Sequence, residues 1–235
     1  MKLNSLFVSS TAVAAVLAGS TLAAAQPGAF SEESKTGYWD RSVEAPAEVL
    51  ELTVSTGYVQ GIGQPRRGVS DLSGALGPGA SLDLGVGYRP SARWMLGASG
   101  SYQFYSRAEL DDDSLAHGAT GRLDATYHFN PFARLDPWAR AGVGYRMLHH
   151  RLSKGHDELL HGLQLLSVTT GLDVRMQRDV AFAPILGADL DLFLWDRTES
   201  VEAPRLNAFV YLGVQGRFDI GGPGGDETPR YASAQ

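Results

Sequence analysis

The histidines are the first residues whose chemistry could define a function. Five of the six fall in two polar stretches that also carry Asp111-Asp112-Asp113 and Asp157-Glu158; they are His117, His149, His150, His156 and His161. Imidazole and carboxylate groups bind divalent metals, and histidine is the commonest general base in hydrolysis. No pair, however, has a spacing that fixes geometry on a strand or helix, and a solvated polar loop accounts for them better. The sequence therefore predicts no catalytic residue, no metal site and no cofactor.

The pentapeptide GVGYR, at 85–89 and again at 142–146, is a second candidate for chemistry. A G-x-G pair can open a phosphate-binding loop, but that loop must run into a helix. The first copy runs into Pro90, and the second continues in an alternating pattern. Each copy fits a strand whose valine and tyrosine face one way, while its glycines and arginine face the other.

The same alternation predicts eight strands between residues 49 and 219. They lie at about 51–60, 80–89, 94–105, 119–129, 138–148, 165–176, 180–194 and 206–219. Long connections alternate with short ones: 61–79, 106–118, 149–164 and 195–205 are long, whereas 90–93, 130–137 and 177–179 are short. Pro184 falls inside the seventh strand, where its missing N–H predicts a β-bulge.

One face of every predicted strand is apolar and uncharged, and the opposite faces carry five acids and five arginines. These ten residues are Asp83, Arg122, Asp124, Arg140, Arg146, Asp173, Arg175, Asp189, Asp191 and Arg217. A water-soluble ligand barrel would turn the apolar face inward and the charges outward. A membrane barrel inverts this arrangement, with apolar side chains facing lipid and charges facing one another.

Three features favour the membrane arrangement. Aromatic residues of the apolar face gather near strand ends, where two interfacial girdles would lie; they are Tyr58, Tyr88, Trp94, Tyr102, Phe104, Tyr127, Phe129, Tyr145 and Phe218. The predicted strands reach ten or more residues, enough to cross a bilayer at a tilt. Long and short connections alternate as in outer-membrane barrels. The expected fold is all-β, an eight-stranded antiparallel transmembrane up-and-down β-barrel.

An eight-stranded barrel is only wide enough to be filled by side chains. Inward glycines, including those of both GVGYR copies, make room for long arginines beside Met95, Phe193, Phe209 and Tyr211. An arginine turned to the lipid midplane would cost about 2–4 kcal/mol, so the charges belong inside as matched pairs. Such a network could line an ion path, but in so narrow a barrel a plug of salt bridges is the favoured interpretation.

The chain ends predict export. Residues 1–25 have a short basic start, an apolar stretch and an Ala23-Ala24-Ala25 cleavage site, which is typical of a signal peptide. Residues 26–48 are expected to form a polar periplasmic segment and residues 220–235 a disordered tail, with the barrel at 49–219 between them.

Cysteine is absent, which excludes disulfides and lipid anchoring, and the net charge of -6 makes nucleic acid an unfavourable partner.

The chain resembles the small eight-stranded β-barrels of the Gram-negative outer membrane, the group of OmpA-like transmembrane domains and OmpW-like proteins. PWARAGVGYR at 137–146 and NAFVYLGVQGRF at 207–218 carry the resemblance. It implies an outer-membrane location, lipid as a partner and recognition of the last strand by the barrel-assembly machinery. Gly216 departs from the pattern, since that position is usually aromatic. The His-x-Ser pair of the family's lipid A deacylases does not occur in this chain.

Three functions remain open at this point. The preferred one is a non-enzymatic structural or surface-interaction barrel with long extracellular loops, whose loop partner is unknown. The second is a porin-like narrow pore or hydrophobic-solute conduit. The third is a rim enzyme that uses the loop histidines.

Overall fold

The computed structural model describes residues 43–65, 71–106, 115–151 and 157–221, all within the compact unit Tyr38–Gln235. The expected signal peptide, most of the segment 26–48 and the tail after residue 221 lie outside the described residues. The elements are β1 (Val49–Ile62), α1 (Leu72–Leu76), β2 (Gly79–Arg89), β3 (Trp94–Tyr105), β4 (Leu115–His128), β5 (Leu135–Arg151), β6 (Asp157–Gln177), β7 (Val180–Asp196), β8 (Glu199–Ser200) and β9 (Leu206–Ile220).

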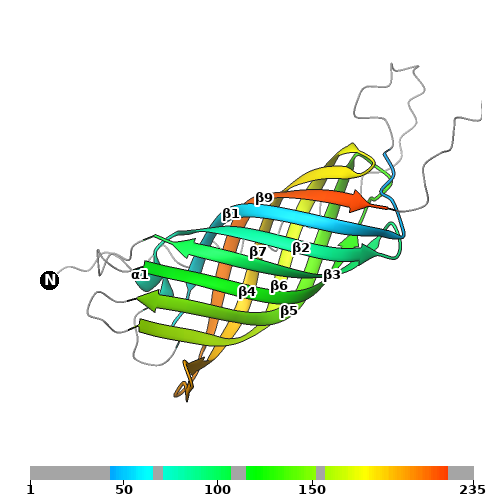
Figure 1. Cartoon of the computed structure of the whole chain (residues 1–235). Coiled ribbons are helices and arrows are strands. Elements are labelled where there is room, and N and C mark those ends of the chain that lie inside the picture. The colour runs from blue at the N-terminus through cyan, green and yellow to red at the C-terminus, as the bar shows by residue number, and fades with distance from the viewer. Residues whose placement is uncertain (1–42, 66–70, 107–114, 152–156, 222–235) are drawn as a thin grey trace, which may run out of the picture. The chain divides into compact units, whose positions relative to one another are not determined.

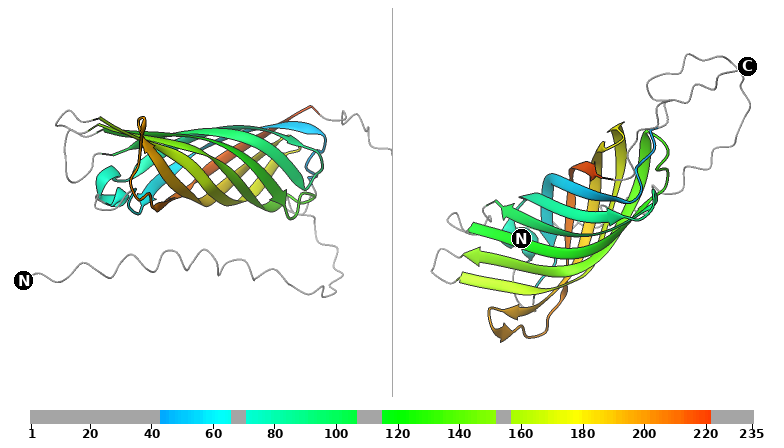
Figure 2. Two further views of the ribbon diagram at one scale, coloured as in Figure 1. Left: turned by 90° about the horizontal axis from the view of Figure 1, so that it is seen from below. Right: turned by 45° about the vertical axis from the view of Figure 1, so that its right-hand side comes forward.

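Eight of these strands close into a barrel, which confirms the predicted fold (Figures 1 and 2). Strands β1 to β7 pair antiparallel in chain order, and β9 joins β7 to β1. The two-residue β8 pairs only with the end of β7 and takes no part in the closure. Because every barrel strand has two neighbours, no sheet edge remains open within the barrel.

The alternation of residue types places apolar side chains outside and charged ones inside. Leu123 is 66% exposed, whereas Asp124, the next residue, is 9% exposed. The same contrast holds between Leu84 at 56% and Asp83 at 9%. Apolar side chains on the outside of a closed barrel are stable against hydrocarbon, so the polarity is that of a membrane barrel. Among the described residues, no helix is long and apolar enough to cross a membrane.

The two ends of the barrel differ. The short connections β2–β3, β4–β5 and β6–β7 lie at one end, together with the start of β1 and the finish of β9; we call this the turn end. The connections β1–β2, β3–β4, β5–β6 and β7–β9 lie at the other, the loop end, and α1 belongs to the first of them (Figure 1). At the turn end the backbone N–H of Ala45 donates to the Pro131 carbonyl, so the residues just before β1 contact the barrel.

Two predicted loops are wrong in extent. β4 begins at Leu115, and β5 and β6 reach Arg151 and Asp157, so strand replaces 115–118 of the expected 106–118 loop and most of the expected 149–164 loop. The cross-strand ladder continues there through polar pairs such as His117 with His149. The outward apolar residues stop before the hydrogen-bonded ladder does, which is why the apolar pattern underestimates strand length.

The predicted β-bulge at Pro184 is also wrong. The ladder between β6 and β7 skips the pairs at Pro184 and Ala183, but Gly171–Ile185 and Val174–Phe182 on either side keep the same register. Pro184 remains in register with Val214 of β9. A missing N–H removes one ladder hydrogen bond and requires no extra residue, so the sheet loses pairing on one side only. The register shifts of β6 lie elsewhere, at 161–162, 164–166 and 175–177.

Candidate functional site in the barrel lumen

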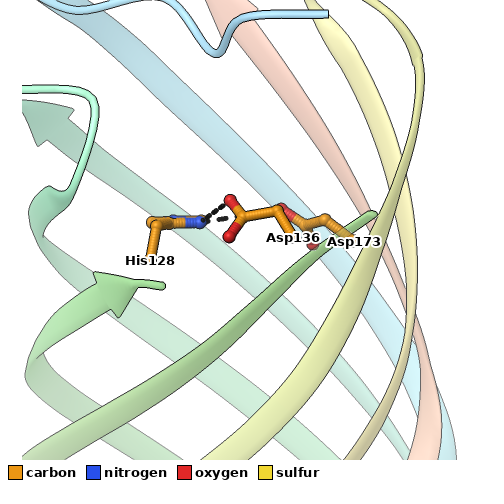
Figure 3. A group of neighbouring side chains, drawn as sticks. All are labelled: His128, Asp136 and Asp173. Carbon is orange, nitrogen blue, oxygen red and sulfur yellow. Dashed lines mark hydrogen bonds and ion pairs between the residues drawn. The ribbon is translucent and has the colours of Figure 1, made fainter. Parts of the chain in front are cut away.

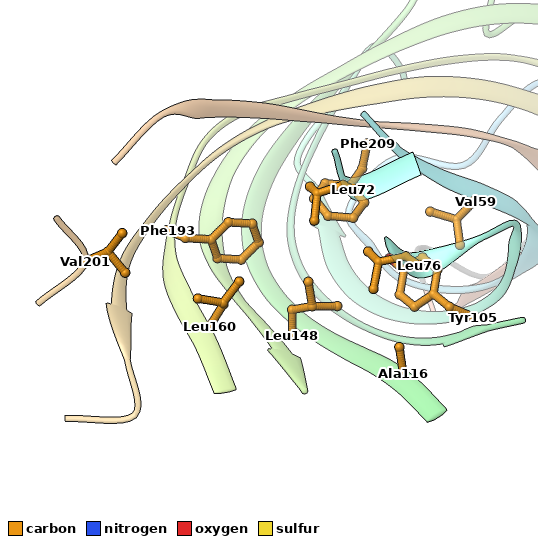
Figure 4. Packing of buried hydrophobic residues seen from close by; sticks show 10 residues of the cluster. All are labelled: Val59, Leu72, Leu76, Tyr105, Ala116, Leu148, Leu160, Phe193, Val201 and Phe209. Carbon is orange, nitrogen blue, oxygen red and sulfur yellow. The ribbon is translucent and has the colours of Figure 1, made fainter. Parts of the chain in front are cut away.

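Apolar side chains fill the lumen at the loop end (Figure 4). The cluster consists of Val59, Leu72, Leu76, Tyr105, Ala116, Leu148, Leu160, Phe193, Val201 and Phe209. Helix α1 contributes Leu72 and Leu76, which are four positions apart, lie on one face and are 3% and 1% exposed. This apolar cap, as we call the cluster, closes the loop end from within.

Local sequence chemistry positions α1. The carboxylate of Asp71 accepts a hydrogen bond from the backbone N–H of Ser73 at 2.9 Å, which caps the start of the helix. Gly77 ends the helix with φ of 60°, a conformation that favours glycine. The N–H of Leu72 also donates to the Gly63 carbonyl, which ties α1 to the end of β1.

A layer of ion pairs lies beneath the apolar cap. Arg146 binds Asp189 at 2.5 Å and Asp191 at 3.1 Å, and its guanidinium lies 4.0 Å from the ring centroid of Phe209. Arg146 also donates to Gln103 at 2.7 Å. The arginine therefore has both carboxylate partners and an aromatic face, the environment in which a buried guanidinium is well compensated.

The middle of the lumen holds a second pair of arginines. Arg122 binds Asp83 at 2.8 Å and approaches Asp124 at 3.6 Å, and Arg140 approaches Asp124 at 3.7 Å. A cavity of about 30 Å³ adjoins them, and its lining includes Asp83, Arg122, Arg140 and Tyr211. That volume holds about two water molecules and no larger solute.

The turn end is closed by a network centred on Arg217. Its guanidinium lies 3.1 Å from Glu51 and 3.3 Å from Asp173, and Arg89 also binds Glu51. Arg175 binds Asp219 at 3.0 Å. All of these side chains are 1% exposed or less. We call these six residues the turn-end network.

The turn-end network shares Asp173 with a second group, which also contains His128 and Asp136 (Figure 3). Among the described residues, this is the one group that could offer three ligand atoms to a metal ion. His128 Nδ1 lies 2.6 Å from Asp136, and the indole N–H of Trp138 donates to Asp173 at 2.8 Å. Nη1 of Arg217 lies 2.7 Å from Nε2 of His128. Since a guanidinium only donates hydrogen bonds, Nε2 must be the acceptor. Nδ1 therefore carries the ring proton and donates a hydrogen bond to the carboxylate of Asp136.

This arrangement leaves His128 no free ring nitrogen for catalysis or metal binding. Both ring nitrogens are engaged, so His128 can neither abstract a proton from a substrate nor bind a metal without displacing Arg217. The arginine already supplies the positive charge that a cation would bring to Asp173. The geometry is that of a structural network rather than a catalytic dyad or a metal centre.

The structure places all ten of the predicted charged residues on the inner face. Nine are at most 9% exposed, and the side chain of Arg122 is 8% exposed. All ten take part in the ion pairs and clusters described above. The predicted set omits Glu51, His128, Asp136 and Asp219, which lie at strand ends near the turns. Glu51, His128 and Asp219 already lie inside predicted strands, at positions that the alternation turns inward, and extending the fifth strand back to Leu135 would have added Asp136.

The two GVGYR copies occupy different levels of the barrel. Arg89 of the first belongs to the turn-end network, and Arg146 of the second lies below the apolar cap. A Cβ at Gly87 would lie 2.5 Å from Sδ of Met95, and one at Gly144 would lie 2.8 Å from Oε1 of Gln164. The glycines therefore make room for larger side chains on neighbouring strands.

Four of the histidines expected in or beside the outer loops lie on strands near the loop end. His117 lies on β4, His149 and His150 on β5 and His161 on β6, whereas His156 lies outside the described residues. Imidazole of His161 is engaged by Tyr145 at 2.5 Å and by the carbonyl of Arg197 at 2.6 Å.

A closed wall of eight antiparallel strands, apolar outside and charged within, defines a transmembrane β-barrel. No protein-family model and no curated protein matches the chain. Among solved structures it is similar to Neisserial surface protein A, with a TM-score of 0.50 and 15% identity over 72% of this chain and 96% of that one. The chain thus has the fold of the small bacterial outer-membrane barrels.

Two further solved structures are similar to the chain. The N-terminal β-barrel domain of OprF from Pseudomonas aeruginosa gives a TM-score of 0.44 and 16% identity, over 74% of this chain and 99% of that one. The outer membrane protein OprG from the same organism gives 0.46 and 13%, over 74% and 98%.

Proposed function

We propose that the mature chain is a non-enzymatic barrel of the Gram-negative outer membrane, with a permanently filled lumen and a loop end that serves as a contact surface outside the cell. Cleavage after residue 25 and recognition of β9 by the barrel-assembly machinery belong to the same proposal. Lipid of the outer membrane is its immediate partner.

The continuous filling of the lumen is the observation that supports this proposal. The apolar cap, the ion pairs of Arg146 and the turn-end network follow one another along the barrel, and the internal cavity holds only about 30 Å³. A conducting path would have to break several buried ion pairs, each of which costs about 3–5 kcal/mol when one partner is removed. An ion therefore meets several such barriers in succession.

Conductance measurement tests the proposal. The refolded barrel is reconstituted in a planar bilayer, and its heat-modifiable migration on gels verifies that the same preparation is folded. We expect no single-channel steps above the noise of the bare bilayer. Reproducible single-channel steps from the folded protein would contradict the filled lumen and show that the barrel is a narrow pore.

A further inference from the structure

The four described histidines of the loop end differ in how their ring nitrogens are used. His161 engages both nitrogens, one with Tyr145 and one with the Arg197 carbonyl. In contrast, Nδ1 of His149 is shielded from solvent and has no hydrogen-bond partner among the described residues. A buried polar nitrogen without a hydrogen-bond partner costs free energy, so the missing partner of His149 Nδ1 needs an explanation.

His149 has a second imidazole beside it. It is the direct cross-strand partner of His117, and both side chains are half-buried on the outer face, with ring centroids 4.8 Å apart and planes at 34°. Tyr102 stacks on the other side of His117, with ring centroids 5.8 Å apart. The pair is thus held side by side by the register of β4 and β5 and by an aromatic neighbour.

We propose that His117 and His149 form a two-imidazole site for a divalent transition-metal ion on the outer wall of the barrel at the loop end. Imidazole nitrogens bind such ions at about 2.0–2.1 Å, so two nitrogens on one ion lie at most about 4.2 Å apart. Ring centroids 4.8 Å apart are compatible with two nitrogens at that separation. Cu²⁺, Zn²⁺ and Ni²⁺ are the ions suited to imidazole, and Cu²⁺ binds most tightly.

The pair lies near the end of the apolar wall, and both imidazoles are half-buried rather than enclosed, although Nδ1 of His149 itself is covered. On β5, His149 lies two residues beyond the outward-facing Met147, and on β4 His117 faces Phe104 of β3. Both histidines are therefore at the loop-end margin of the apolar outer wall. Water completes the coordination of an ion held by only two protein ligands.

Copper titration of the full chain without an affinity tag, folded in detergent micelles, tests the site. We expect electron paramagnetic resonance of one equivalent of Cu²⁺ to show two coordinated imidazole nitrogens. His117→Gln and His149→Gln should each weaken binding about tenfold or more. His161→Gln is the matched control, because this outward histidine is already engaged, and its copper affinity should equal that of the unchanged chain.

Two results would overturn the proposal: copper bound equally well by His149→Gln and the unchanged chain, or a spectrum with a single imidazole nitrogen. A second measurement does not depend on variants that fold. Zn²⁺ should protect His117 and His149, but not His161, from diethyl pyrocarbonate in the unchanged chain, as read by mass spectrometry. Equal modification with and without Zn²⁺ would likewise count against the site.

Discussion

The ring of Tyr211 on β9 lies directly over its cross-strand partner on β7, Gly187: a Cβ at Gly187 would be 2.3 Å from Cζ of the tyrosine. The tyrosine hydroxyl lies 2.5 Å from that of Thr169 on β6, which holds the ring over β7 on the inner wall. The absence of a side chain at one position therefore allows a large one at the next strand.

Gly187→Ala should destabilise the barrel by about 1–3 kcal/mol, because the new methyl group forces Tyr211 from its position. The measurement is urea-induced unfolding of the protein refolded in lipid vesicles. Gly121→Ala is the control, since a Cβ there has no atom within 4 Å. Equal loss of stability in both variants would show that strand propensity, not packing on Tyr211, sets the cost.

Arg217→Met should cost about 3–5 kcal/mol, because Glu51 and Asp173 would keep their buried charge without the guanidinium. Loss of the Arg217 donor also leaves Nε2 of His128 without its partner. Arg93→Met removes an exposed arginine at the turn end and should cost less than about 1 kcal/mol. Chemical unfolding of the two variants under the same conditions gives the comparison, and similar values would contradict a structural role for the turn-end network.

Leu84→Arg tests the inverted polarity of the wall. Leu84 is 56% exposed and lies midway along β2, so the charge would face the bilayer midplane at a cost of about 2–4 kcal/mol. Leu206→Arg places the same charge at the loop-end start of β9, where about 0–1 kcal/mol is expected. Unfolding free energies in vesicles measure the difference. A protein that tolerates Leu84→Arg as well as Leu206→Arg would not have lipid at that position.

Much of this fold follows from local chemistry that a sequence displays. The contrast between Asp83 and Leu84 shows which side of β2 faces the lumen. Repetition of that contrast along the chain predicts the number of barrel strands and the charged residues that point inward. Helix α1 escapes such reasoning, because five residues with two leucines show no periodicity. Its place follows from the free space inside the mouth of the barrel, which is a tertiary property.

Pairwise geometry is the other part that the sequence does not reveal. The pairing of His117 with His149 depends on the register of β4 and β5, and register depends on where each strand ends. Those ends lie beyond the outward apolar residues, where the pattern carries no information. The partner of His128 is hidden for a different reason, since its contact with Arg217 joins residues 89 positions apart on strands that are not neighbours.

The contact between Glu51 and Arg217 joins the first strand to the last, across 166 positions of the chain. Until β9 arrives, Glu51, Asp173 and His128 all lack the guanidinium that they share. An incomplete chain consequently leaves Asp173 and Arg175 without the oppositely charged partners that β9 supplies, Arg217 and Asp219. Closure of the seam between β1 and β9 therefore also completes these buried ion pairs, and a polypeptide that ends before β9 would leave them open.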